Sequence, residues 1–169
     1  MSALTIAPRR SSPPSMRLLV LALALPLALS GCAGLFDTST DTEALAIRDP
    51  GDAAAAARLI SQYRAQHGLS PVVADGELAR AAAVQAGAVA KAGSLSHGNF
   101  AGRMAKLGIR GHAAENLSAG SPSVDGAVAL WTASPGHNAN LLMPQARRVG
   151  IARAEGSRYG QYWALVLAE

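Results

Sequence analysis

Histidine is the side chain in this sequence best suited to acid–base or metal chemistry, because its charge changes near neutral pH. The chain has four histidines. His67 ends an expected helix over residues 53–67, where a cationic ring suits the negative end of the helix dipole. His112 lies in an expected glycine-containing loop. His97 and His137 have more polar neighbours in the sequence, and they are the candidates for function.

Serine catalysis is one chemistry that these residues suggest. It would use Ser134 as nucleophile, His137 as base and Glu115 as the orienting carboxylate. No Gly-x-Ser-x-Gly turn surrounds Ser134, although such a turn exposes the nucleophile in many hydrolases. Ser134 directly precedes Pro135, a pattern typical of a helix N-cap followed by the first helical residue. We therefore interpret Ser134 as a cap and rank serine catalysis below the alternatives.

The N-terminal segment has the parts of a secretory signal. Three arginines within the first 17 residues precede an apolar run over residues 18–29, which is shorter than the roughly 20 residues a membrane span needs. The run ends at Leu29-Ser30-Gly31-Cys32, which resembles the bacterial lipobox. That resemblance implies cleavage before Cys32 and acylation of its sulfur. An ordinary signal peptide with an incidental cysteine is the alternative. We predict a signal peptide over residues 1–31 and a lipid anchor at Cys32.

Export changes what the composition implies. The precursor has 15 basic and 11 acidic residues, and cleavage removes the three signal arginines, so the mature protein is nearly neutral. Nucleic acid is not an expected partner, because no basic run with interleaved aromatic residues remains. Cys32 is the single cysteine, so no intrachain disulfide is available. The expected location is the cell envelope, and because Ala33 rather than aspartate follows the anchor, the outer membrane is favoured where one exists.

The mature chain divides into a tether and a domain. Residues 32–51 are rich in Asp, Thr and Ser and predict a flexible tether. Residues 52–169 have the size of one domain. Caps and apolar spacing predict helices over residues 53–67 after Asp52, 76–93 after Asp75, 100–107, from Ser121-Pro122 onward, and 135–142. Strands are predicted over residues 114–119, 148–154 and 161–168, with 156–160 as a hairpin loop and 69–74 extended.

This order of elements predicts an α+β domain. Helices come first and a hairpin comes last, which indicates helices packed on a small antiparallel sheet. Aromatic residues make up only 4% of the chain while alanine is abundant, so we expect the helices to pack closely through small side chains.

Short motifs spread over the whole domain resemble the CAP superfamily, which includes cysteine-rich secretory proteins, antigen 5 and plant pathogenesis-related proteins. Each motif is weak alone, and their order and spacing carry the resemblance. The matching pieces are Gln62-Tyr63-Arg64, Gly68-Leu69, Ser96-His97, Ala114-Glu115-Asn116-Leu117, Trp131, Ser134-Pro135-Gly136-His137, Asn140, Val149-Gly150-Ile151 and Tyr162-Trp163.

The resemblance implies a three-layer α-β-α sandwich with a central cleft. In that family two histidines and two acidic residues line the cleft, and His97, Glu115 and His137 match three of these positions. The fourth position departs from the animal and plant pattern: three residues after Trp131 stands Ser134 instead of glutamate. The expected ligand-binding residues are therefore His97, Glu115, His137 and Ser134.

The cleft residues leave the question of a metal open. Two neutral imidazoles and one carboxylate suit zinc or another divalent metal with an open position for water. The same three side chains suit a hydrogen-bonded polar cluster without metal, in which Glu115 orients an imidazole.

The leading hypothesis is a membrane-tethered binding module for a small or lipid-like ligand. The competing hypothesis is a metal-dependent hydrolase acting on peptide or cell-envelope material, with Glu115 as the base if it does not itself ligate the metal. Glu115 and His137 are then the candidate catalytic residues. A third is a protein-interaction surface in which the three residues are structural.

Overall fold

Strand β5 (Gly160–Ala168) forms the middle of the domain because it is apolar on both faces. The computed structural model describes residues 46–169. Along β5, Tyr162, Ala164 and Val166 pack into one core, while Trp163 and Leu165 pack into a second core. Successive strand residues point to opposite sides, so this alternation requires a cover on each face of the sheet.

The sheet in residues 46–169 has five strands. β4 (Arg148–Gly156) and β5 form the hairpin that the sequence predicted, closed by the three-residue turn 157–159. β3 (Ala113–Ala119) pairs antiparallel with β5 and is an edge strand. β1 (Ala46–Ile47) and β2 (Val73–Ala74) both pair with β4, and β2 does so in parallel.

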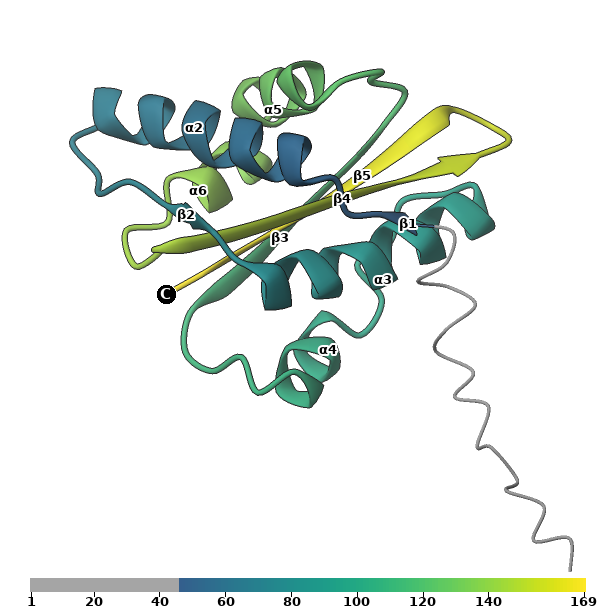
Figure 1. The fold of residues 1–169 in the computed structure, drawn as a ribbon, viewed down its shortest axis with the longest axis horizontal. Coiled ribbons are helices and arrows are strands. Elements are labelled where there is room, and N and C mark those ends of the chain that lie inside the picture. Colours follow the sequence, from purple (N-terminus) through teal and green to yellow (C-terminus); the bar gives the residue numbers. More distant parts are fainter. Residues whose placement is uncertain (1–45) are drawn as a thin grey trace, which may run out of the picture. The chain divides into compact units, whose positions relative to one another are not determined.

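Helices cover both faces, which confirms the α+β three-layer sandwich (Figure 1). α3 (Gly76–Ala92) and α4 (Phe100–Lys106) contribute to the core that contains Tyr162 and Val166. α2 (Pro50–Gln66), α5 (Val124–Ala133) and α6 (Pro135–Leu141) cover the opposite face, over Trp163 and Leu165. In the part of the chain that the structure describes, no helix has the length and apolar character to span a bilayer.

Two helix starts differ from the sequence prediction. α2 begins at Pro50 with Asp49 as its cap, whose carboxylate accepts from the backbone N–H of Gly51 and of Asp52. Asp52, the predicted cap, lies in the first turn and pairs with Arg153 instead. Residues 46–47 and 50–51, which the sequence placed in the predicted tether over 32–51, lie in β1 and at the start of α2. The predicted signal peptide, the lipidation site and the tether up to residue 45 lie outside the described residues.

α5 also starts later than predicted. Its cap is Ser123, and Pro122 is not its first helical residue. The cause is that the indole N–H of Trp163 donates to the Ser121 carbonyl at 2.8 Å, which holds Ser121 in the preceding turn. The helix end predicted at Gly93 is confirmed, because Gly93 adopts a left-handed φ of 64° after α3.

Close packing of α3 on β4 depends on small residues, as the composition indicated. Ala81, Ala82 and Ala86 of α3 are fully buried. Gly150 of β4 lies directly beneath it: a Cβ at this position would be 2.1 Å from the backbone nitrogen of Ala79. Only glycine permits this approach.

A buried arginine joins α2 to the segments after it. Arg64 has no exposed surface and donates to four backbone carbonyls, those of Ser70, Leu141, Met143 and Ala146. Burial lowers the pKa of Arg64, and the nearby charge of Arg147 lowers it further. Arg64 thus supplies hydrogen bonds for carbonyls that would otherwise be buried without partners.

Gly150→Ala tests the packing of α3. We expect it to lower the free energy of unfolding by about 3 kcal/mol, because the added methyl forces the helix away from β4. Gly136→Ala is the matched control, since a Cβ there has nothing within 4 Å. The control should be neutral or slightly stabilising in the same urea titration. A Gly150→Ala variant as stable as the wild type would contradict the described packing.

Candidate functional site

The candidate site is organised by edge strand β3, whose alternating residues face the two helical layers. Leu117 packs into the core under α3 and α4, so Glu115, two residues earlier, faces the same layer. Asn116 faces the opposite layer, where its side chain bonds to α6. Neighbouring residues of one strand therefore hold segments from both sides of the sheet.

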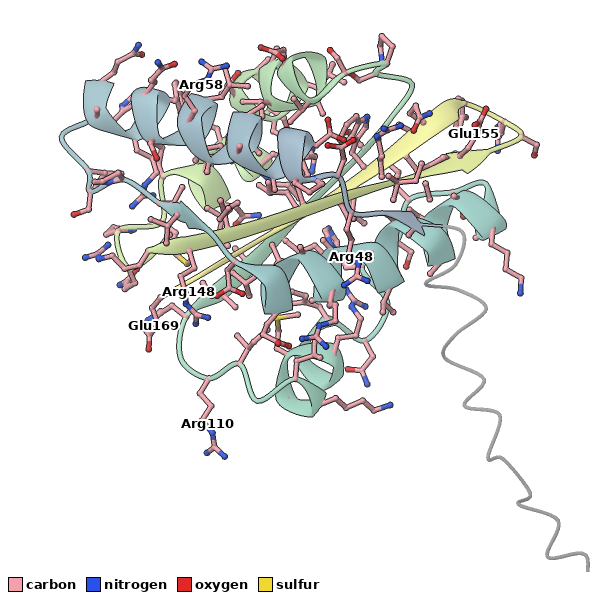
Figure 2. The ribbon with its side chains drawn as sticks, viewed as in Figure 1. Arg48, Arg58, Arg110, Arg148, Glu155 and Glu169 are labelled. Atoms are coloured by element: carbon pink, nitrogen blue, oxygen red, sulfur yellow. The ribbon has the colours of Figure 1, made fainter. Side chains whose placement is uncertain are left out.

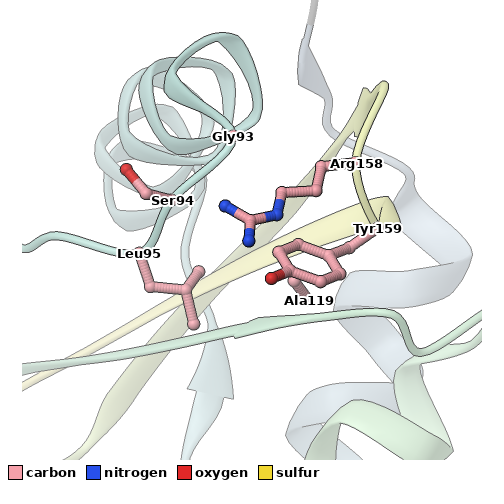
Figure 3. Close-up of a pocket in the computed structure, with 6 residues that line it drawn as sticks. All are labelled: Gly93, Ser94, Leu95, Ala119, Arg158 and Tyr159. Atoms are coloured by element: carbon pink, nitrogen blue, oxygen red, sulfur yellow. The ribbon is translucent and has the colours of Figure 1, made fainter.

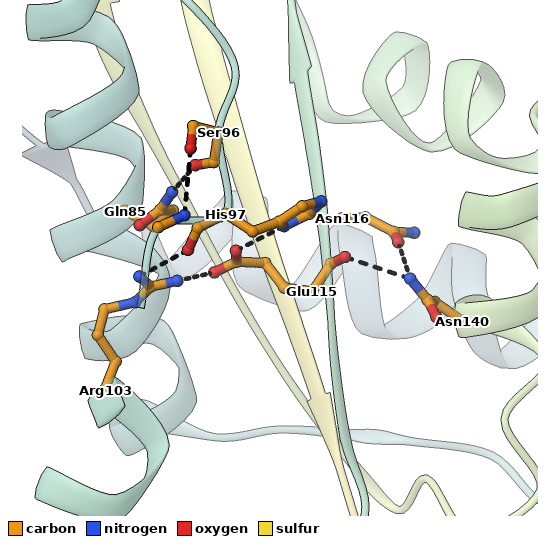
Figure 4. A network of polar contacts seen from close by, with 8 residues as sticks. Gln85, Ser96, His97, Arg103, Glu115, Asn116 and Asn140 are labelled. Atoms are coloured by element: carbon orange, nitrogen blue, oxygen red, sulfur yellow. Dashed lines mark hydrogen bonds and ion pairs between the residues drawn. The ribbon is translucent and has the colours of Figure 1, made fainter. Parts of the chain in front are cut away.

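Glu115 is a buried carboxylate with two partners. Its side chain is 1% exposed, and its two oxygens accept separate hydrogen bonds. Oε1 lies 2.9 Å from Nδ1 of His97, and Oε2 lies 2.5 Å from Nη2 of Arg103 (Figure 4). Burying a carboxylate is costly unless a counter-charge and hydrogen bonds replace its water, and Arg103 and His97 supply both.

The loop that contains His97 is also held from α3 and α4. Arg103 donates through Nη1 to the backbone carbonyl of His97 at 3.0 Å. Gln85 of α3 donates through Nε2 to the backbone carbonyl of Ser96. These contacts fix the peptide groups before and after His97, so the position of its imidazole does not depend on Glu115 alone.

The His97 imidazole combines a fixed inner edge with an open outer edge. Its side chain is 56% exposed, whereas Glu115 beneath it is buried. A carboxylate only accepts hydrogen bonds, so the ring directs its Nδ1–H toward Glu115. In the neutral ring, Nε2 is then the acceptor that remains for another molecule.

His137 reaches the same strand from the other face of the sheet. The Asn116 side chain donates to the His137 carbonyl at 3.0 Å. Asn140 donates to the Asn116 side chain at 2.8 Å and to the Glu115 carbonyl at 3.2 Å. These bonds fix α6 beside β3, with the polar side chains of the loop and of α6 flanking the strand (Figure 4).

The two histidines lie close enough to influence each other. Burial lowers the pKa of His137 below its ordinary value of 6.5, and the electrostatic interaction with the nearby His97 ring lowers it further. His137 is therefore neutral at pH 7. The structure pairs His97 with Glu115 and places His137 nearby, and among the described residues no hydrogen bond joins His137 to Glu115.

Ser134 does not complete a catalytic set. It occupies the N-cap position of α6, as predicted, but its side chain makes no capping hydrogen bond. Within residues 46–169, no hydrogen bond links the Ser134 hydroxyl to His137. The arrangement gives the hydroxyl no base that would activate it.

The side chains of His97, Glu115 and His137 are poorly arranged to bind a metal ion. No group of three or more His, Cys, Asp or Glu side chains in the described part of the chain is placed to hold a metal ion. Arg103 occupies one oxygen of Glu115, and a guanidinium there repels a cation. With Glu115 orienting His97, two imidazoles remain, one fewer than the three protein ligands usual for catalytic zinc. Zinc binding by His97, Glu115 and His137 stays a prediction from the sequence, and this arrangement does not favour it.

The other two histidines form no hydrogen bond with these residues within residues 46–169. His67 is the C-cap of α2, with its ring edge against Tyr63 at a centroid distance of 4.8 Å. His112 is exposed and bonds through Nδ1 to Glu169 at 2.9 Å, which lowers the pKa of that carboxyl. Both contacts fit structural roles.

Arg103 and Gln85 are site residues that sequence reasoning did not assign. Gln85 carried a weak indication, because it is polar within the apolar stripe of its helix. Arg103 carried none, since an arginine on a short helix is ordinarily a surface residue. Its partner Glu115 lies twelve residues later on another element.

The domain is similar in fold to bacterial surface and extracellular proteins. An outer surface protein from Borrelia burgdorferi aligns with a TM-score of 0.63 and 18% identity, over 73% of this chain and 96% of that one. An extracellular protein containing a SCP domain from Bacillus anthracis aligns with a TM-score of 0.62 and 22% identity, over 70% of this chain. A cysteine-rich secretory protein from Staphylococcus aureus aligns with a TM-score of 0.58 and 19% identity, over 72%. The match spans 40% of each of the latter two proteins.

At these identities the solved structures establish the fold alone. A search of curated protein sequences gives no significant match. A family model described as "CAP: Cysteine-rich secretory protein family" matches residues 57–167, which is more than half of the chain. The chain belongs to the cysteine-rich secretory protein (CAP) family.

Proposed function

We propose that this protein is a lipid-anchored binding module of the bacterial cell envelope, with His97 and His137 contacting a small or lipid-like ligand at the edge of β3. The observation that carries the proposal is that both carboxylate oxygens of Glu115 are hydrogen-bonded. Both oxygens of this carboxylate hold other side chains, His97 and Arg103. The carboxylate therefore positions a recognition surface and is not free to act as a general base.

The chemistry of the two rings suits recognition of a polar group. His97 presents one ring nitrogen outward from a rigid loop, and His137 is neutral, so it both donates and accepts a hydrogen bond. Preorganised polar groups give a ligand orientation and specificity at a low entropic cost.

The envelope location rests on two supports. The lipobox-like segment ending at Cys32 supports a lipid anchor. The names of the similar folds describe an outer surface protein and an extracellular protein, which agrees with export.

Metal-dependent hydrolysis of peptide or cell-envelope material is the second candidate. The neutral state of His137 favours it, because metal ligation and general-base catalysis both require an unprotonated ring. Arg103 beside Glu115 counts against it.

Replacing both site histidines tests the binding function. Native mass spectrometry would follow ligand capture from a bacterial envelope lipid extract by wild type, a His97→Ala/His137→Ala variant and a His67→Ala control. We expect one bound ligand in the wild type and the control, and at least about a tenfold loss in the double variant, since a good polar contact contributes a factor of this order. Equal capture by all three proteins would refute the proposed site.

Replacing the predicted anchor tests localisation. We expect Cys32→Ser to move the protein from the membrane fraction to the soluble exported fraction, because no acyl chain can be attached to serine in this position. Metabolic labelling with a fatty acid should mark the wild type alone. Failure of the wild type to incorporate the fatty acid would contradict a lipid anchor at Cys32.

The low pKa of His137 predicts a pH dependence. The unfolded chain binds a proton near pH 6.5 and the folded chain only at lower pH. The contribution of His137 to stability is therefore present above 6.5 and is lost as the pH falls from 6.5 through the lower pKa of the folded state. We expect the free energy of unfolding to fall less between pH 7 and 5 in His137→Gln than in the wild type, measured by urea denaturation. Identical pH profiles would show that His137 is not desolvated.

A further inference from the structure

A hollow lies beside the His97 loop, at the turn of the β4–β5 hairpin. Its volume is about 370 Å³, within the range of small-molecule sites. The wall comes from the end of α3, the loop after it, the end of β3 and the hairpin turn (Figure 3). The lining residues are Gly93, Ser94, Leu95, Ala119, Arg158 and Tyr159.

Arg158 gives this hollow a positive charge that forms no ion pair with an acidic side chain of residues 46–169. Its guanidinium lies 5.0 Å from the centre of the Tyr159 ring, between that ring and Ser94 (Figure 3). Among the ion pairs of residues 46–169, none includes Arg158. An arginine stacked on an aromatic ring keeps its forked donors free, and these match a carboxylate or a phosphate.

The same hollow exposes apolar surface. Leu95 is 49% exposed and Tyr159 is 48% exposed, two of the few large hydrophobic residues so open to solvent in the described domain. Both flank the Arg158 guanidinium (Figure 3). A positive group next to apolar surface is complementary to a molecule with a negative head and an apolar body.

A structural role for Arg158 explains its position but not the exposed apolar surface beside it. The side chain lies near the C-terminal end of α3, where a cation gains about 0.3–1 kcal/mol from the helix dipole. That interaction needs neither the exposed Leu95 nor the exposed Tyr159. The combination of charge, apolar surface and volume favours a ligand.

We propose that this hollow binds an anionic amphiphile, a carboxylate or phosphate group joined to a short apolar chain. Arg158 binds the anion, Ser94 adds a hydroxyl, and Leu95 and Tyr159 contact the apolar part. This site goes beyond the proposed function because it shares no residue with the His97–Glu115–His137 set. The two sites are connected, since Ser94 and Leu95 lead directly into Ser96 and His97.

A lipid head group and a free organic acid are both sources of this chemistry. The test uses octyl phosphate as the free amphiphile, vesicles containing phosphatidylglycerol as the lipid source, and octyl glucoside as the uncharged comparison. Binding would be measured by isothermal titration and vesicle flotation with the mature chain carrying Cys32→Ser. This change removes the acyl anchor and touches none of the elements over residues 46–169.

Arg158→Gln and Tyr159→Ala are the test variants, and Arg110→Gln is the control. Arg110 is an exposed arginine on a loop far from the hairpin (Figure 2). Arg110→Gln therefore removes the same positive charge as Arg158→Gln without changing the hollow. We expect octyl phosphate to bind the wild type and Arg110→Gln equally, with at least about a tenfold loss in Arg158→Gln and a smaller loss in Tyr159→Ala. Octyl glucoside should bind much more weakly than octyl phosphate.

The outcomes separate this site from the proposed function. Binding to octyl phosphate alone identifies a soluble acid as the ligand. Binding to both octyl phosphate and the phosphatidylglycerol vesicles identifies a lipid head group. In either case the binding must be lost in Arg158→Gln. A loss in the His97→Ala/His137→Ala variant with none in Arg158→Gln would overturn this inference and support the histidine site. Failure to bind either probe, or a change in Arg158→Gln confined to thermal stability, would also overturn it.

Discussion

The buried carboxylate of Glu115 is the constraint on which the candidate site depends. A carboxylate removed from water needs a counter-charge and hydrogen bonds, and here Arg103 and His97 provide them from α4 and from the loop after α3. Satisfying that one charge fixes two segments against the edge of the sheet. The same pairing determines how His97 is presented. The Nδ1 edge of its ring is held by Glu115, and the opposite edge faces solvent.

The rest of the fold supplies the edge strand that carries Glu115. β5 packs against both helical layers, and β3 pairs with it along its whole length, so the two faces of β3 are fixed relative to both layers. Gly150 permits α3 to lie close to the sheet, which positions Gln85 to hold the His97 loop. On the opposite face, the hydrogen bond between Asn116 and Asn140 holds α6 beside β3.

Local patterns in the sequence predicted the local structure well. The Asp75 cap, the Gly93 helix end and the last strand, β5, are all confirmed. The errors at Asp52 and at Ser121 arise from long-range contacts, with Arg153 and Trp163 respectively, which local patterns do not encode. The same limit applies to the site. The family resemblance identified His97, Glu115 and His137, but the role of Arg103 depends on a pairing between two elements that only the fold brings together.

The central claim is that Glu115 holds His97 by its Nδ1–H and leaves the two imidazoles as recognition groups without a metal. Nuclear magnetic resonance of the protein with ¹⁵N-labelled histidine measures this directly, because the ring nitrogens report both tautomer and ligation. The account predicts that His97 carries its proton on Nδ1, that His137 is neutral at pH 7, and that one equivalent of zinc leaves both spectra unchanged. Stoichiometric shifts of both rings on adding zinc, absent in a Glu115→Gln variant, would contradict it.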